Sequence, residues 1–184
     1  KGDMIMASLG RFTQKFGQGI RPNLFTVNGG FGVVGNMEDA DSFLIKAAAL
    51  PSSNLGTITI PYRGREIKRS GDRTFTDWSI TVLCDEKMDI HRKFMDWSNG
   101  FVSLSDTDRG LAYADWQVEP LQVGSGNNQG AAVGSLGTTG VEKAKFNLVD
   151  CWPVEVGTVD LSFDSADSVA EFTVTIGFDH WTYQ

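Results

Sequence analysis

The chain has 184 residues, of which 41% are hydrophobic and 21% charged, the balance of a soluble globular protein with one domain. It has no run of 18 apolar residues and no charged-then-apolar leader, so neither a membrane anchor nor a secretory signal is expected. The net charge of −7 lies entirely in the last 39 residues, which carry seven carboxylates and no Lys or Arg. An acidic tail argues against tight nucleic-acid binding there, because phosphate binding requires cations, but it is compatible with a surface that DNA passes without adhering.

The N-terminal third is predicted to combine an arm, turns and short strands. Residues 1–21 form a polar, Gly-punctuated arm, and strands are expected over 24–27 and 42–50, with a Gly-rich, turn-like segment at 28–41 between them. Residues 57–60 alternate polar and apolar side chains, the pattern of a half-buried strand.

Residues 61–74 are strongly basic and hold nearly a third of the Lys and Arg side chains. This segment could touch phosphate, but an exposed hairpin that pairs with acidic protein surfaces is at least as well supported.

The middle of the chain predicts a strand followed by the only long helix. Residues 76–84 alternate, with Trp78, Ile80 and Val82 on one face. Asp85 is placed to cap a helix over 86–98, in which one apolar stripe faces the core, and Gly100 is a plausible stop signal.

The last 84 residues predict further strands around a flexible loop. Residues 113–118 and 141–149 are strand candidates, 124–140 form an uncharged Gly-rich loop, and Trp152-Pro153 breaks the second strand. The clearest alternation follows in 158–164 and 171–179, which are expected to form a hairpin with one dry face and one wet, acidic face.

No catalytic constellation is evident, and the protein is predicted not to be an enzyme. Cys84 and Cys151 have neither metal-site nor disulfide spacing and are expected to be reduced, mostly buried thiols. His91 is expected to be a packed or surface side chain, and His180 lies near the C-terminus. No cofactor or metal is predicted.

Four sequence blocks resemble the tail tube protein of contractile-tailed bacteriophages. The most specific is Gly-Asp-Arg-Thr-Phe-Thr-Asp-Trp at 71–78, continuing through Lys-Phe-Met-Asp-Trp at 93–97. The others are Arg-Pro-Asn-Leu-Phe at 21–25, Ala-Leu-Pro at 49–51, and Trp152-Pro153 with the segment that ends at Trp181. The motif residues taken as structural are Gly71, Asp72, Arg73, Phe75, Asp77, Trp78, Trp97 and Trp152, with Arg73 bonded to backbone or to Asp77.

The resemblance implies a single, mainly β tail tube domain over 1–184, an antiparallel β-barrel or sandwich with one flanking helix and a variable, loop-rich segment at 101–140. It also implies homohexameric rings that stack into a hollow tube inside a contractile sheath, through which the genome leaves. The implied partners are copies of the chain itself, the tail sheath protein, and the baseplate tube-initiator, tape measure and tail terminator proteins. DNA would pass without specific binding, and the tail would assemble in the host cytoplasm and end up in the virion.

Two sets of site residues are predicted on this basis. The channel wall is assigned to Asp160, Asp164, Glu171 and Asp179, with outward-facing or subunit-bridging carboxylates as the alternative. A hairpin over 54–72 is assigned to contacts between rings or subunits, through Arg63, Arg65, Lys68 and Arg69, with a solvated turn as the alternative.

Three other functions remain open from the sequence. They are the tube of a phage-like protein-injection machine, a baseplate tube-initiator of the same fold, and, from another class, a monomeric ligand-binding β-sandwich that recognises carbohydrate. A stable monomer with exposed aromatic side chains would favour the last of these.

Overall fold

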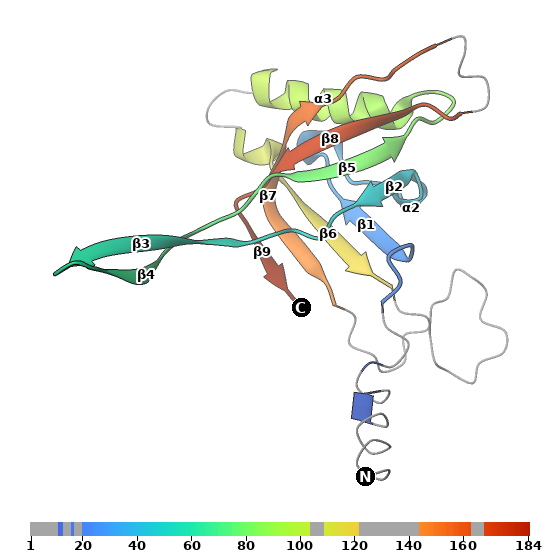
Figure 1. Ribbon diagram of the computed structural model, residues 1–184. Coiled ribbons are helices and arrows are strands. Elements are labelled where there is room, and N and C mark those ends of the chain that lie inside the picture. The colour runs from blue at the N-terminus through green and yellow to red at the C-terminus, as the bar shows by residue number, and fades with distance from the viewer. Residues whose placement is uncertain (1–10, 13–15, 17–19, 104–108, 122–143, 163–167) are drawn as a thin grey trace. The chain divides into compact units, whose positions relative to one another are not determined.

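The computed structural model describes residues 11–12, 16, 20–103, 109–121, 144–162 and 168–184, and within them the protein is mainly antiparallel β-structure (Figure 1). The chain divides into two compact units, 1–26 with 119–144, and 27–118 with 145–184. In the first unit, the Leu121 amide donates to the Leu24 carbonyl at 2.9 Å. Within the described ranges the strands are β1 (Phe25–Gly29), β2 (Ile45–Ala48), β3 (Asn54–Tyr62), β4 (Arg65–Thr74), β5 (Trp78–Leu83), β6 (Ala114–Pro120), β7 (Phe146–Val156), β8 (Glu171–Gly177) and β9 (His180–Tyr183). The helices there include the α-helices α2 (Asp39–Ser42) and α3 (Asp89–Ser103) and the short 3-10 helices η1 (Gly32–Val34) and η2 (Arg109–Ala112).

Seven strands form one sheet and the other two form a separate hairpin. The sheet runs in the order β1-β6-β7-β8-β5-β2, with β9 also paired to β7, while β3 pairs only with β4. Strand β7 takes part in three ladders, because its first half pairs with β6 and β9 and its second half pairs with β8. The expected β-class is therefore confirmed.

The core lies between α3 and the inner side chains of the strands. Figure 1 shows α3 running alongside β5 and β8, and its apolar stripe of Ile90, Phe94 and Trp97 is at most 1% exposed. Trp116 of β6 stacks on Phe94 and Trp97, with ring centroids 5.9 Å apart in both pairs. The cluster is anchored by polar bonds as well as packing, since the indole N–H groups of Trp97 and Trp116 donate to backbone carbonyls.

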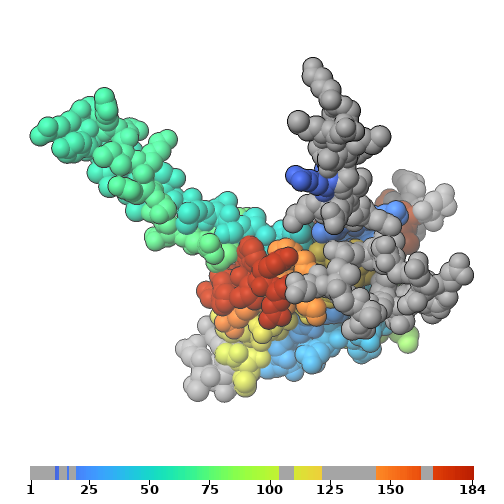
Figure 2. Space-filling model, turned by 90° about the horizontal axis from the view of Figure 1, so that it is seen from below, coloured from blue at the N-terminus to red at the C-terminus, as the bar shows by residue number. Residues whose placement is uncertain are grey.

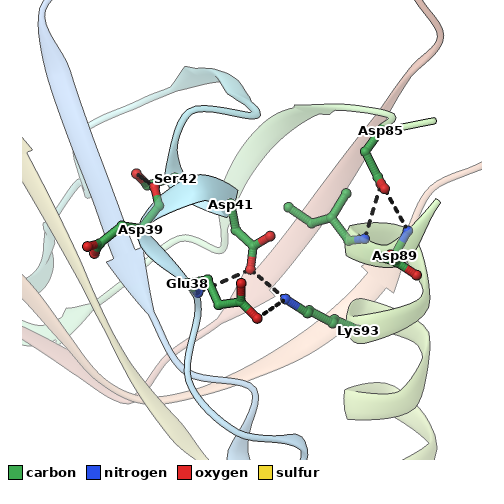
Figure 3. Close-up of polar contacts among 8 residues, drawn as sticks. Glu38, Asp39, Asp41, Ser42, Asp85, Asp89 and Lys93 are labelled. Carbon is green, nitrogen blue, oxygen red and sulfur yellow. Dashed lines mark hydrogen bonds and ion pairs between the residues drawn. The ribbon is translucent and has the colours of Figure 1, made fainter. Parts of the chain in front are cut away.

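Helix α3 begins three residues later and ends five residues later than the sequence predicts. Asp85 does cap it, accepting hydrogen bonds from the amides of Asp89 at 3.1 Å and Ile90 at 3.3 Å (Figure 3). Gly100 does not end the helix. It is buried inside it, where an added Cβ would lie 3.3 Å from Val33, so its small size serves packing.

The predicted break at Trp152-Pro153 is wrong, because β7 runs through both residues to Val156. Pro153 lies opposite Ile176, and the register shifts between Pro153 and Glu155. A proline has no amide hydrogen to give to a ladder, and such an irregularity is where a strand tolerates one.

The predicted strand over 158–164 is also wrong in the part that the structure describes. Residues 158–162 form no strand, and 163–167, including the expected hairpin turn, lie outside the described residues. Gly157 makes the last ladder bond, donating to the Thr173 carbonyl at 2.8 Å, and Leu161 beyond it is 84% exposed. Alternation alone does not make a strand when the apolar side chains have no surface to pack against.

Three further strand predictions need adjustment. The candidate at 42–50 contains a shorter strand, β2, because Ser42 ends α2 and Phe43 is 83% exposed. The strand at 57–60 is present in β3 but is exposed along its whole length rather than half-buried. The strand at 171–179 ends at Gly177, and a short further strand, β9, was not expected.

Replacing Asp85 with alanine is expected to lower the free energy of unfolding by about 1 kcal/mol at pH 7, the usual value of a helix N-cap. Partial burial works to raise the pKa of Asp85, but the backbone amides that donate to it lower this pKa below its ordinary value. A lowered folded-state pKa stabilises the fold above the unfolded pKa of about 3.9, and that contribution is lost as pH falls through the folded value.

The measurement is urea unfolding of the wild type, Asp85→Ala and Asp85→Asn at pH 7 and at pH 3. Asparagine caps helices about as well but does not titrate. The loss of unfolding free energy in Asp85→Ala relative to the wild type should therefore be smaller at pH 3 than at pH 7. An equal loss at the two pH values would contradict the capping assignment.

Candidate assembly and channel surfaces

The β3–β4 hairpin carries no core of its own and is exposed on both faces. In Figure 2 its teal and green atoms stand clear of the rest of their unit. Arg63 and Gly64 form the two-residue turn, with φ of 47° and 78°, the left-handed values that a type I′ hairpin turn requires. The Arg63 guanidinium lies 5.4 Å from the ring centroid of Tyr62, which anchors the tip.

The register sorts the hairpin into two different faces. Directly opposed residues share a face, and the face alternates along each strand. One face carries apolar side chains with two arginines, in the pairs Ile58–Arg69, Ile60–Ile67 and Tyr62–Arg65. The other is polar, in the pairs Thr57–Ser70, Thr59–Lys68 and Pro61–Glu66.

The four basic residues assigned to assembly contacts are therefore not equivalent. Arg65 and Arg69 flank the apolar pair Ile60–Ile67, Lys68 lies on the opposite face, and Arg63 lies in the turn. Ile60 is 47% and Ile67 41% exposed. Exposed apolar side chains that gather on one face are a common feature of interaction sites.

The second surface is the outer face of the sheet formed by β2, β5, β8 and the second half of β7. Their inner side chains, including Ile80, Val82, Val174 and Ile176, are buried. The outer side chains opposite one another on β5 and β8 are hydroxylic, in the pairs Ser79–Thr175 and Thr81–Thr173. Glu171 at the start of β8 and Glu155 of β7, opposite Thr175, lie on the same outer face.

The four carboxylates predicted for the channel wall are not brought together by the strands. Only Glu171 lies in a strand, where it is exposed. Asp160 is exposed in the segment after β7, and Asp179 is exposed between β8 and β9, with a carboxylate oxygen 3.0 Å from Nδ1 of His180. Asp164 lies outside the described residues.

The structure shows where the motif residues lie and what several of them contact. Trp78 is buried and donates to the Ala49 carbonyl, Phe75 packs on Phe178 with centroids 5.8 Å apart, and Trp152 packs on Tyr113. Gly71 and Asp72 lie in β4, Asp77 is exposed just before β5, and Trp97 belongs to the core. Arg73 lies exposed opposite Leu55, and no bond joins it to Asp77.

The sequence does not predict the ion-pair link that joins α2 and α3. Lys93 of α3 lies 2.7 Å from Oδ2 of Asp41 and 3.5 Å from Oε1 of Glu38, both at α2 (Figure 3). The hydrogen bond to Asp41 raises the pKa of Lys93 despite partial desolvation. The sequence gives no signal for this link, because its partners are 52 residues apart.

The described residues contain no arrangement typical of catalysis. No three His, Cys, Asp or Glu side chains within these ranges are placed to hold a metal ion. Burial raises the pKa of Cys151 to about 12, which keeps the thiol protonated, and His91 packs edge-on against Phe172. The helices within the described ranges include none that is long and apolar enough to cross a membrane.

The described residues thus combine an antiparallel sheet with an exposed amphipathic hairpin. Comparisons with known proteins identify the family of the chain. A family model described as phage tail tube protein matches residues 12–184. Tail tube protein gp19 of Enterobacteria phage T6 is 31% identical over 161 residues, which cover 88% of this chain and 90% of that protein, and its counterpart in phage T4 is 30% identical over the same length. The chain belongs to the phage tail tube protein family, whose members are structural components of the virion tail and not enzymes.

Solved structures share the fold at lower identity. A chain of the PVC sheath–tube complex, from an extracellular contractile injection system in its extended state, superposes with a TM-score of 0.57 at 14% identity, covering 94% of this chain and 97% of that one. A chain of the anti-feeding prophage baseplate gives 0.60 at 12% identity, covering 88% and 93%. At these identities the likeness concerns the fold.

Proposed function

We propose that this protein forms homohexameric rings that stack into a hollow tube inside a contractile sheath, and that the tube conducts the genome during ejection. The proposal rests on the apolar face of the β3–β4 hairpin, which is exposed to solvent when this chain is taken as a single subunit. The chain also belongs to the phage tail tube protein family. Burying Ile60 and Ile67 against another copy removes this apolar surface from water.

Closure into a ring also accounts for the sheet edges. Strand β2 stands at one end of the strand order, so its outer edge has no partner strand among the described residues. Exposed strand edges can pair with other chains without control unless they are covered. In a closed ring built from head-to-tail contacts, each subunit can cover an edge of its neighbour.

In such a ring the outer face of β8 lines the channel, with Glu171 on the wall. Asp160, Asp164 and Asp179 stay predicted contributors to its negative charge. The wall is then polar and acidic, which suits a passage for DNA, because phosphates bind strongly only where cations gather. At about 0.15 M salt the Debye length is about 8 Å, so wall charges act only on DNA that comes close.

The proposed partners follow from this assembly. Sheath protein surrounds the tube, and a baseplate tube-initiator, a tape measure and a tail terminator act at its interior and ends. Assembly takes place in the host cytoplasm. Solved relatives of the fold come from a sheath–tube complex and a sheath/tube terminator, which is consistent with these partners.

Negative-stain microscopy combined with sedimentation tests the proposal. Purified protein at high concentration, or nucleated on baseplates, is expected to give sixfold rings or hollow rods. A monomer that stays dispersed under both conditions would contradict it. Tubes that load protein rather than DNA in the producing cell would instead indicate an injection machine.

A further inference from the structure

The outer face of β5 and β8 has a neutral centre. Its four adjacent side chains, Ser79, Thr81, Thr173 and Thr175, carry hydroxyl groups and no charge. They lie directly across from one another, so they form a continuous block on the face opposite the buried core. Hydroxyl groups form hydrogen bonds with water, but they carry no positive charge that would attract phosphate.

One cation lies on this face, and it is already paired. Lys46 is the only Lys or Arg in β2, β5, β7 and β8 as the structure describes them. Its ammonium forms an ion pair with the Glu171 carboxylate, and the two side chains are 55% and 43% exposed.

The pair reaches across an intervening strand, and a bulge makes this possible. In β2, Ile45 lies opposite Val82 and Ala47 opposite Thr81, so Lys46 is an extra residue without a partner in β5. A bulge of this kind redirects a side chain. Glu171 lies opposite Leu83 on the other side of β5, where the Lys46 side chain meets it.

We infer that Glu171 masks Lys46 from the phosphates of passing DNA, so that its role is to neutralise a particular cation rather than to add repulsion. The inference rests on the proposed function, because it takes this face as the channel wall. An exposed ion pair contributes little to folding stability, so stability does not account for the pair. Without Glu171, every subunit would present a free ammonium beside the hydroxyl block, repeated around each ring.

Loss of Glu171 is therefore expected to make the tube bind DNA in a salt-dependent way. If six ammonium groups in a ring each neutralise one phosphate, affinity falls by about a thousandfold between 50 and 200 mM salt. Tubes of Glu171→Gln should therefore retain duplex DNA at 50 mM NaCl and release it at 200 mM NaCl. Wild-type tubes should not retain it at either concentration.

The experiment assembles tubes from the wild type, Glu171→Gln, Lys46→Gln and the double variant, and follows ejection or co-sedimentation of a fluorescent DNA duplex. Retention by Glu171→Gln that disappears in the double variant, with none in Lys46→Gln, is the expected result. Release by Glu171→Gln equal to that of the wild type would overturn the inference. Equal retention by Glu171→Gln and the double variant would overturn it too, because the DNA would then be held by another group.

A second measurement does not need tubes. In dispersed protein, the ε-methylene NMR signal of Lys46 is expected to shift on addition of a short duplex in Glu171→Gln and to stay in place in the wild type. Equal shifts in both proteins would contradict the masking role. Failure of the wild type to form tubes would count against the proposed function, whereas this signal tests the masking by itself.

Discussion

Replacing Ile60 with aspartate is expected to prevent tube assembly while leaving the fold of the subunit intact. Ile60 is 47% exposed on a hairpin whose strands are exposed along nearly their whole length, so the subunit core loses nothing. In the assembled tube the same side chain would be buried against another copy. Burying an isoleucine contributes about 1.5–3 kcal/mol, and burying an unpaired carboxylate in its place adds a further penalty.

The expected result is a rise of at least about a hundredfold in the concentration needed for assembly, since every 1.4 kcal/mol is a factor of ten. Sedimentation of a concentration series measures it, and thermal unfolding of the dispersed subunit checks that the fold is retained. Thr59→Asp is the matched control, because it adds the same charge one residue away, on the opposite face and across from Lys68. If Thr59→Asp blocks assembly as strongly as Ile60→Asp, the apolar face is not the contact.

Replacing Trp116 with alanine is expected to unfold or severely destabilise the subunit. Trp116 is 1% exposed and makes ring contacts with Phe31, Trp78, Phe94 and Trp97 at centroid distances of 5.9 Å. Its indole N–H also donates to the Gly30 carbonyl at 2.9 Å. Truncating a buried tryptophan costs about 3–5 kcal/mol, a large share of the stability of a typical domain.

Urea unfolding followed by circular dichroism measures this loss. Trp116→Phe keeps much of the ring packing but loses the hydrogen bond, so a smaller loss of about 1–2 kcal/mol is expected. Met95→Ala on the exposed side of α3, where Met95 is 41% exposed, should change stability by less than about 0.5 kcal/mol. Similar losses for Trp116→Ala and Met95→Ala would contradict the placement of the core.

Local patterns in the sequence predict the elements that pack on the core. The alternation of Trp78, Ile80 and Val82 and the helical spacing of Ile90, Phe94 and Trp97 both correspond to buried faces. Each pattern works because its apolar side chains meet a partner surface. The same alternation in 158–162 gives no strand, because Leu161 remains in solvent.

Features that depend on distant partners were not predictable. Gly29 is required by close packing, because an added Cβ would lie 2.3 Å from the Trp116 ring, 87 positions away in the chain. The pairing of Lys46 with Glu171 spans 125 residues. Charge counting locates the excess carboxylates in the tail, but it could not show that one of them, Glu171, is paired with a cation.

The basic hairpin illustrates the same limit. The sequence shows its positive charge, whereas its register shows that Ile58, Ile60 and Ile67 share a face with only two of the basic side chains. A two-residue turn at Arg63-Gly64 fixes this register. If the hairpin is an assembly contact, its register favours burial of the apolar face over pairing of charges as the main contribution.

A cryo-electron microscopy reconstruction of the assembled protein would show which surface lines the lumen and which is buried between copies. We expect sixfold rings in which Thr173, Thr175 and the Lys46–Glu171 pair face the lumen, and in which Ile60 and Ile67 are buried against another copy. A tube whose lumen is lined by another surface, with the hairpin solvated on both faces, would contradict this expectation.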